Sequence, residues 1–302
     1  MKPIARSAAT LTIIVLVCAA AASLATLAWR GSFPDSSPGP AVNSVLAEAR
    51  GWSAATLLVA IPLAAIALAA AGRGSLRGRL VWVGSLAYFV YTYLEFAVSP
   101  PFSALYLLYV GAFACAIPAL VIGAASIDVD ELSGAFGKRA PRRTIAVFAL
   151  AFAVLLALAW LKGIVVRTVA GNFGWPSGED AVGHVVHALD LGLQVPLGLA
   201  AGLLLLRRRP AGDLVAAIML VNAVCMGMSL TAMVGWASAA SGATLWTAGP
   251  FAIASGVAVI LAVAFFRAGA VASRERVKLP SPGSEPLGGH VVRGAPRSRR
   301  AG

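Results

Sequence analysis

Residues 144–163 read TIAVFALAFAVLLALAWLKG and contain a single charged side chain, that of Lys162. About 20 apolar residues form a helix long enough to cross the hydrocarbon core of a bilayer. Nearly every face of such a helix would be apolar, which is typical of a helix surrounded by lipid. The stretch therefore predicts a membrane-spanning helix.

Seven further stretches of the 302-residue chain have the same character. The eight predicted spans lie at about 8–29, 52–72, 80–98, 102–124, 144–163, 188–206, 214–234 and 247–266. The composition agrees, because 59% of the residues are hydrophobic and only 12% are charged, against about 25% charged in soluble domains. A core of this size cannot hide so much apolar surface from water. We expect an all-α integral membrane bundle of eight helices, and not a soluble enzyme, a disordered chain or a secreted disulfide scaffold.

Basic residues are distributed unevenly over the connections between the spans. Of the 24 Lys and Arg residues, 20 precede the first span, follow the last, or lie after the second, fourth and sixth spans. The other connections hold only Arg30, Arg50 and Arg167. The positive-inside rule then places both termini in the cytoplasm. The net charge of +12 is accordingly interpreted as a sign of membrane orientation and not of nucleic-acid binding.

Residues 268–302 differ from the transmembrane domain predicted over 1–267. They contain four prolines, many basic residues and few large apolar side chains. Such a segment cannot bury enough apolar surface to fold, so we predict a disordered, basic cytoplasmic tail. Its charges would either attract anionic lipid or only fix the orientation of the chain, and both interpretations stay open.

The two halves of the chain have the same pattern of spans and connections. In each half, a long connection follows the first span, a short basic one follows the second, and a short outer one follows the third. Parallel halves of this kind are typical of internal repeats. At an offset of 140 residues Gly31 coincides with Gly171 and Phe33 with Phe173. Such matches also arise by chance in a chain rich in Ala, Gly and Val, so a duplication stays open.

Motifs of soluble catalytic chemistry are missing. The glycines between residues 72 and 78 lack the dinucleotide-binding spacing, and Gly137-Lys138 lacks the rest of a P-loop. No H-E-x-x-H or G-x-S-x-G sequence occurs. Cys18, Cys115 and Cys225 lie far apart in apolar stretches and are interpreted as packing residues. We therefore expect no cofactor and no metal centre, and the sequence disfavours an enzyme without excluding one.

Three charged residues lie within or beside the predicted spans: Glu95, Lys162 and Asp190. A charge at the centre of a spanning helix costs about 2.5–3.5 kcal/mol on insertion scales, so each needs a physical reason. The topology puts all three near the outer ends of their helices. They would either form one outer-side cluster or lie singly in the interface, where Lys162 snorkels and Asp190 occupies a helix N-terminus.

The third span adds polar groups to the same region. Gly84, Tyr88, Tyr91 and Glu95 are spaced by four, three and four residues and so share one helix face. Buried phenol groups need hydrogen-bond partners. This face would either hold a structural hydrogen-bond network or line the path of a solute.

His184, His187 and Asp190 follow one another at intervals of three at the start of the sixth span. Imidazole and carboxylate groups bind metals, and histidine responds to protons near neutral pH. The spacing is also compatible with a simple solvated helix start. Further along this span, Pro196 predicts a kink that frees a backbone carbonyl. Asn222 and Ser229 in the seventh span are interpreted as contacts between helices.

Two stretches of the chain, 82–110 and 187–212, resemble a pattern in uncharacterised multi-pass membrane proteins of high-GC bacteria. The first contains WVGSLAYFVYTY and the second contains HALDLGLQVP. The resemblance implies an integral protein of a bacterial plasma (inner) membrane. It implies no known activity and transfers no site residue.

The hypothesis that fits these observations best is a small-solute transporter or channel component in the lipid bilayer. The residues expected to bind substrate are Glu95, Lys162, Asp190, Tyr91, Tyr88 and His187. The alternative is a scaffold or sensor subunit that transports nothing and packs against a membrane-protein partner. An intramembrane enzyme is the third hypothesis.

Overall fold

The computed structural model describes residues 4–32, 40–99, 102–136, 140–172 and 179–278, which are helices and short connections without a strand. The first half contains α1 (Arg6–Ala28), a 3-10 turn (Arg30–Ser32), α2 (Pro40–Ala55), α3 (Ile61–Gly72), α4 (Leu76–Val98) and α5 (Tyr106–Ala125). The short α6 (Val129–Ala135) follows. The second half contains α7 (Arg142–Val169), α8 (Glu179–Leu189), α9 (Val195–Leu206), α10 (Ala211–Ser241), a 3-10 turn (Leu245–Ala248) and α11 (Gly249–Lys278).

Within the ranges just given, eight helical segments are long and apolar enough to cross a membrane. They run over Arg6–Ala28, Val45–Gly72, Leu76–Val98, Tyr106–Ala125, Arg142–Val169, Gly183–Leu206, Ala211–Ser241 and Leu245–Gly269. Each contains most of one predicted span, so the number of spans and the all-α class are confirmed. The chain has the architecture of a multi-pass membrane protein.

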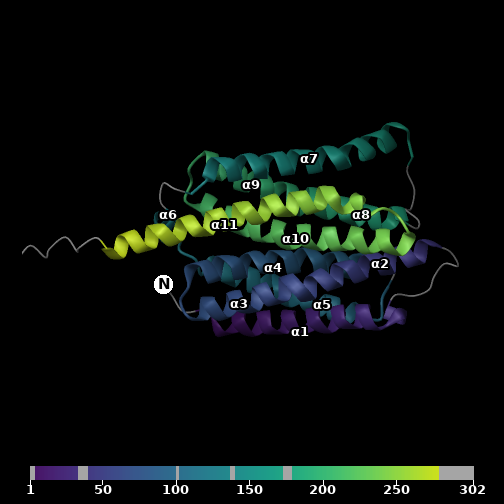
Figure 1. The fold of residues 1–302 in the computed structure, drawn as a ribbon, viewed down its shortest axis with the longest axis horizontal. Coiled ribbons are helices and arrows are strands. Elements are labelled where there is room, and N and C mark those ends of the chain that lie inside the picture. The colour runs from purple at the N-terminus through teal and green to yellow at the C-terminus, as the bar shows by residue number, and fades with distance from the viewer. Residues whose placement is uncertain (1–3, 33–39, 100–101, 137–139, 173–178, 279–302) are drawn as a thin grey trace, which may run out of the picture.

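The helices lie side by side along the long axis of the molecule (Figure 1). α1 to α5 form one half of the bundle, and α7 to α11 form the other. α10 lies between them, because it contacts α2 and α4 of the first half and α9 and α11 of the second. Its approach to α4 is close at Gly84, where an added Cβ would lie 2.6 Å from the Cβ of Val221. Glycine at this position therefore permits the two halves to meet.

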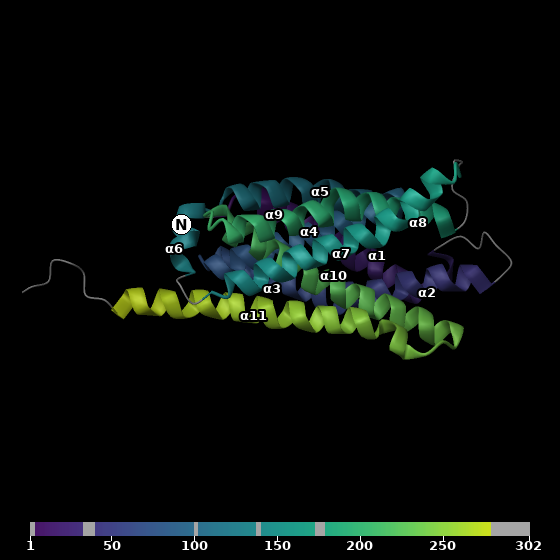
Figure 2. The same cartoon turned by 90° about the horizontal axis from the view of Figure 1, so that it is seen from above.

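The two ends of the bundle differ in charge. α1 begins and α11 ends at the same end, where α6 and the α9–α10 connection also lie (Figure 1). This end, called the basic end below, carries Arg73, Arg142, Arg143 and Arg207–Arg209. The orientation of this end toward the cytoplasm stays a prediction. α11 runs along one side of the bundle and extends beyond it at the basic end (Figure 2).

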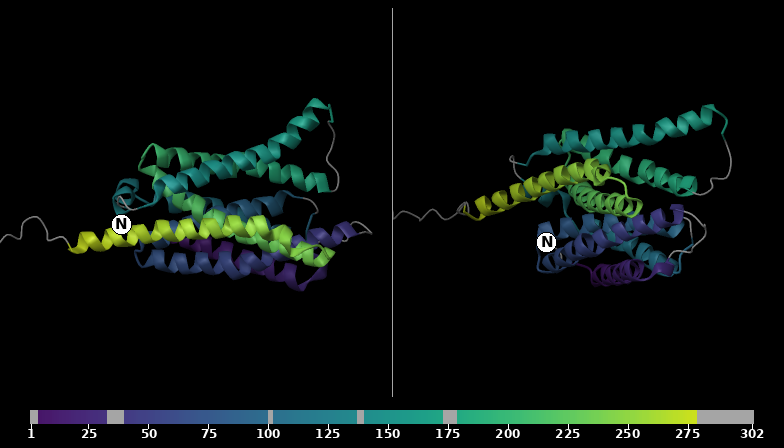
Figure 3. Two further views of the ribbon diagram at one scale, coloured as in Figure 1. Left: turned by 45° about the horizontal axis from the view of Figure 1, so that its top comes forward. Right: turned by 45° about the vertical axis from the view of Figure 1, so that its right-hand side comes forward.

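Two helices extend beyond their predicted spans. α11 continues past residue 267 to Lys278, so the first part of the predicted tail is helical. Residues 279–302 lie outside the described residues, and the disordered tail stays a prediction. α7 continues to Val169, and residues 165–172 are exposed. Its last turns stand away from the neighbouring helices (Figure 3).

The buried side chains form two clusters with different chemistry. The cluster toward the basic end is mostly aliphatic and includes Leu86, Ile145 and Leu220. The cluster toward the opposite end is rich in aromatic rings, among them Trp52, Tyr88, Phe89, Tyr93 and Tyr109. The polar groups of the candidate site lie with this aromatic cluster.

Candidate functional site

In the part of the chain that the structure describes, two π-helical turns interrupt the spanning helices. One covers Thr56–Ala60 in the second span, and the other covers Asp190–Gln194 in the sixth span. Each is followed two residues later by a proline, Pro62 or Pro196. Proline has no N–H for the carbonyl four residues earlier and crowds it, and a wider turn relieves this crowding. The kink predicted at Pro196 is thus a π turn, a feature frequent at functional sites.

Asp190 opens the second π turn and is the centre of the candidate site. It is only 8% exposed. Its Oδ1 accepts a hydrogen bond from the Tyr91 hydroxyl at 2.7 Å, and its Oδ2 accepts one from the Trp160 Nε1–H at 2.8 Å. The third, fifth and sixth spans therefore converge on one carboxylate. Among the described residues no cation forms an ion pair with it.

Further ionisable groups surround Asp190. Glu95 lies one turn beyond Tyr91, is partly buried, and is within electrostatic range of Asp190 and Glu48. The ring of His187 packs against Trp160 with centroids 4.3 Å apart, and His187 is also within electrostatic range of Asp190. The site thus combines carboxyl groups with aromatic rings and an imidazole.

Of the two alternatives for Lys162, the structure favours the one in which it lies apart from the carboxylates. Lys162 is exposed, and within the described part of the chain no ion pair joins it to Glu95 or Asp190. The reason is the helical period, because Trp160 faces Asp190 and a residue two positions later points to nearly the opposite side of α7. Trp160 is the residue that sequence reasoning missed. An indole N–H within a spanning helix needs a partner, and that requirement was the available signal.

A second layer of polar contacts lies deeper in the bundle. Gln194, at the end of the second π turn, accepts a hydrogen bond from the Asn222 side-chain amide at 2.8 Å. The Tyr88 hydroxyl contacts the hydroxyl of Thr56 at 2.7 Å and that of Ser229 at 2.8 Å. The interpretation of Asn222 and Ser229 as contacts between helices is confirmed. Both π turns therefore direct a side chain toward a tyrosine of α4.

Some hydrogen-bonding capacity in this region is unused. The Trp52 Nε1–H and the Asn222 Oδ1 are buried, and neither has a partner among the described residues. The ring of Trp52 stacks on that of Tyr88, with centroids 6.4 Å apart. A buried polar atom without a partner is unfavourable. A solute or water molecule would satisfy these atoms.

The polar groups are separated from the basic end by apolar packing. α4 and α10 meet at Gly84 and Val221, and the neighbouring buried side chains Val83, Leu86 and Leu220 are apolar. This constriction lies on the basic side of Tyr88. The candidate site therefore lies toward the end of the bundle opposite the basic end, and apolar side chains separate it from the basic end.

Within the described ranges, no group of three His, Cys, Asp or Glu side chains is placed to hold a metal ion. Comparisons of the chain with protein-family models, curated proteins and solved structures give no match.

Proposed function

We propose that the chain is a small-solute transporter whose binding carboxylate is Asp190. The observation that carries the proposal is a carboxylate inside a spanning segment, held by Tyr91 and Trp160 and paired with no cation among the described residues. An unpaired negative charge in a medium of low dielectric is costly. A proton or a positively charged solute would neutralise it.

The surroundings favour a small organic cation or a proton as the bound species. Glu95 adds a second carboxyl group, and the rings of Tyr91, Trp160 and His187 border the region. Aromatic faces attract cations, and the attraction grows when water is excluded. We include Tyr88 as the deeper hydrogen-bonding group and leave out Lys162, which is exposed.

The constriction at Gly84 and Val221 favours a transporter over an open channel. A channel needs a continuous polar path, whereas a transporter opens its site to one side at a time. Between the candidate site and the basic end, side chains pack tightly against one another. A rearrangement between α4 and α10 would be required for release toward the basic end.

The membrane orientation is part of the same proposal. The excess of Lys and Arg at the basic end supports a cytoplasmic position for that end, and hence for both termini. The resemblance of residues 82–110 and 187–212 to bacterial membrane proteins supports a bacterial plasma membrane. Reporter fusions after Pro141 and Val169 should report opposite sides.

One observation favours the alternative, a sensor or scaffold subunit. Both oxygens of Asp190 already accept hydrogen bonds from the protein itself. A carboxylate held in this way also serves to join three helices. Binding of a solute distinguishes the two functions.

The test uses the purified full chain in detergent with a panel of small cations, namely choline, tetramethylammonium, guanidinium and sodium. The transporter proposal predicts that at least one of them raises the melting temperature. The increase should vanish in Asp190→Asn and persist in Lys162→Gln, which removes a charge from the same end of the bundle. Stabilisation that persists in Asp190→Asn would contradict the proposed site.

A further inference from the structure

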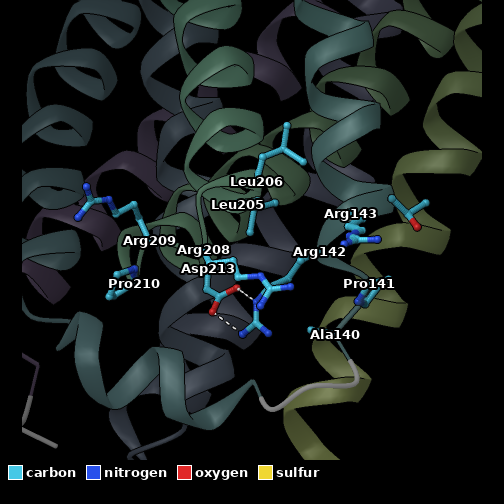
Figure 4. Close-up of a pocket in the computed structure, with 11 residues that line it drawn as sticks. Ala140, Pro141, Arg142, Arg143, Leu205, Leu206, Arg208, Arg209, Pro210 and Asp213 are labelled. Atoms are coloured by element: carbon cyan, nitrogen blue, oxygen red, sulfur yellow. Dashed lines mark hydrogen bonds and ion pairs between the residues drawn. The ribbon is translucent and has the colours of Figure 1, made fainter.

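A cavity of about 700 Å³ opens at the basic end, and Asp190 is not among its lining residues (Figure 4). The start of α7, the end of α9 and the start of α10 form its walls. Its lining includes four arginines, namely Arg142, Arg143, Arg208 and Arg209, and one carboxylate, Asp213. The cavity is thus strongly basic.

One of the four arginines is held by the protein itself. Arg142 donates from Nε to Asp213 Oδ1 at 2.8 Å and from Nη2 to Oδ2 at 2.7 Å. This two-point contact fixes the guanidinium and neutralises the one carboxylate among the described residues of the lining. Arg143, Arg208 and Arg209 form no ion pair within the described residues. Figure 4 shows Arg208 beside the Arg142–Asp213 pair, with Arg143 and Arg209 on either side.

Two helix N-termini border the same cavity. α7 begins after Pro141 and α10 begins after Pro210, and neither first turn is capped by a side-chain hydrogen bond. One N–H of each first turn is already used, that of Arg142 by the Ala140 carbonyl at 2.7 Å and that of Gly212 by the Arg209 carbonyl at 2.8 Å. The helix dipole adds partial positive charge at both N-termini. An anion is therefore favoured by the backbone as well as by the arginines.

The end of α9 determines where Arg208 lies. Its φ is 51°, and it is the only residue other than glycine with a positive φ among those described. Glycine is preferred in this left-handed conformation, which commonly ends a helix. An arginine here therefore gives up some stability, and its side chain lies at the cavity (Figure 4). The conformation ends α9 in the usual way, with the Arg208 N–H donating to the Leu205 carbonyl at 3.1 Å and the Arg209 N–H to the Leu204 carbonyl at 3.0 Å.

From this combination we propose that the basic cavity binds a phosphate group, with Arg143 and Arg208 as the main ligands. The planar guanidinium of arginine matches the geometry of phosphate oxygens. Two sources would supply the group: the headgroup of an anionic phospholipid, which basic pockets between spanning helices bind, or a soluble phosphate compound. Arg142 joins α7 to α10 at the cavity wall through its contact with Asp213, and its charge is neutralised by that carboxylate.

The test measures both sources on the full chain. One arm titrates inorganic phosphate and glycerol 3-phosphate into protein in detergent by calorimetry. The other counts the phosphatidylglycerol and phosphatidylcholine molecules that stay bound in native mass spectrometry. The variants are Arg208→Gly and Arg143→Gln. The matched control is Arg73→Gln, which removes an exposed arginine from the same end but outside the cavity.

We expect each cavity variant to weaken binding of the phosphate probe at least about tenfold, since a hydrogen bond to a charged group is lost. The control should bind like the wild type. Arg208→Gly should keep or raise the melting temperature, because glycine adopts a positive φ freely, so its loss of binding cannot come from unfolding.

Loss of phosphatidylglycerol alone would identify a lipid headgroup as the source, and loss of the soluble probes alone would identify a soluble phosphate compound. Unchanged binding in both cavity variants would overturn the proposal. An equal loss in Arg73→Gln would overturn it as well, since binding would then follow only the overall charge.

Discussion

The two π turns among the described residues have the same backbone geometry but differ in chemistry. They lie in the second and sixth spans, 134 residues apart, each two residues before a proline. In both, the first and fifth side chains are buried and the third position is exposed. The buried pair is Thr56 and Ala60 in the first turn, but Asp190 and Gln194 in the second.

This difference indicates what the backbone and the side chains each contribute to the candidate site. The wide turn places its first residue against a tyrosine of α4 in both halves, Tyr88 or Tyr91. Only the second turn adds a charge. Both halves thus contain the same π turn, and the presence of Asp190 makes the turn of the second half a candidate site. The shared turn also favours an internal duplication with an offset of 134 residues instead of the 140 considered from the sequence.

Deletion of the extra residue of each π turn should give the largest difference in unfolding free energy between the two turns. Deletion of Gly192 would restore an α-helical turn and rotate Asp190 away from Tyr91 and Trp160. We expect a loss of about 4 kcal/mol in unfolding free energy, because hydrogen bonds to charged groups contribute about 1.5–3 kcal/mol each. Deletion of Leu58, the matched position, disturbs only a contact between hydroxyls and should cost about 1 kcal/mol.

Both deleted residues are exposed, so little packing is lost in either variant. The purified protein is unfolded by titration with SDS, and circular dichroism monitors the loss of helix. Equal losses in the two variants would show that Asp190 contributes no more than Thr56.

The spans were predictable and the contacts between them were not. A run of about 20 apolar residues is a local property, and it located the eight candidate spans of the described structure. The pairing of Trp160 with Asp190 depends on which face of α7 turns toward the sixth span, and nearly every face of α7 is apolar. For the same reason the sequence left open whether Lys162 joins the cluster or lies apart, and the structure has its side chain exposed. Tyr91 was identified because its spacing from Glu95 marks one face of α4.

Substitution of Tyr91 and of Tyr88 should give a smaller difference in unfolding free energy. Tyr91→Phe removes a hydrogen bond to a carboxylate and should lower the unfolding free energy by about 2 kcal/mol. Tyr88→Phe removes contacts with two neutral hydroxyls and should cost about 1 kcal/mol. Thr56 retains its bond to the Trp52 carbonyl in that variant. The same SDS titration measures both, and a larger loss in Tyr88→Phe would reverse the ranking of the two turns.

Lys162→Met should have the smallest effect. The side chain is exposed and pairs with neither Glu95 nor Asp190 in the described structure. Exposed charges contribute little to stability. We expect the melting temperature of this variant to equal that of the wild type. A clear decrease would restore Lys162 to the site and would show that α7 turns a different face inward.

The central claim, that Asp190 binds the transported cation, is tested most directly by flux. The wild type, Asp190→Asn and Thr56→Val are reconstituted into liposomes, and uptake is measured for the cation that stabilises the protein in detergent. Loss of a buried charged partner costs about 2–5 kcal/mol, which corresponds to a factor between about 30 and a few thousand. We predict that uptake falls by at least about 30-fold in Asp190→Asn and changes by no more than about fivefold, the equivalent of about 1 kcal/mol, in Thr56→Val. Wild-type uptake by Asp190→Asn would contradict the claim.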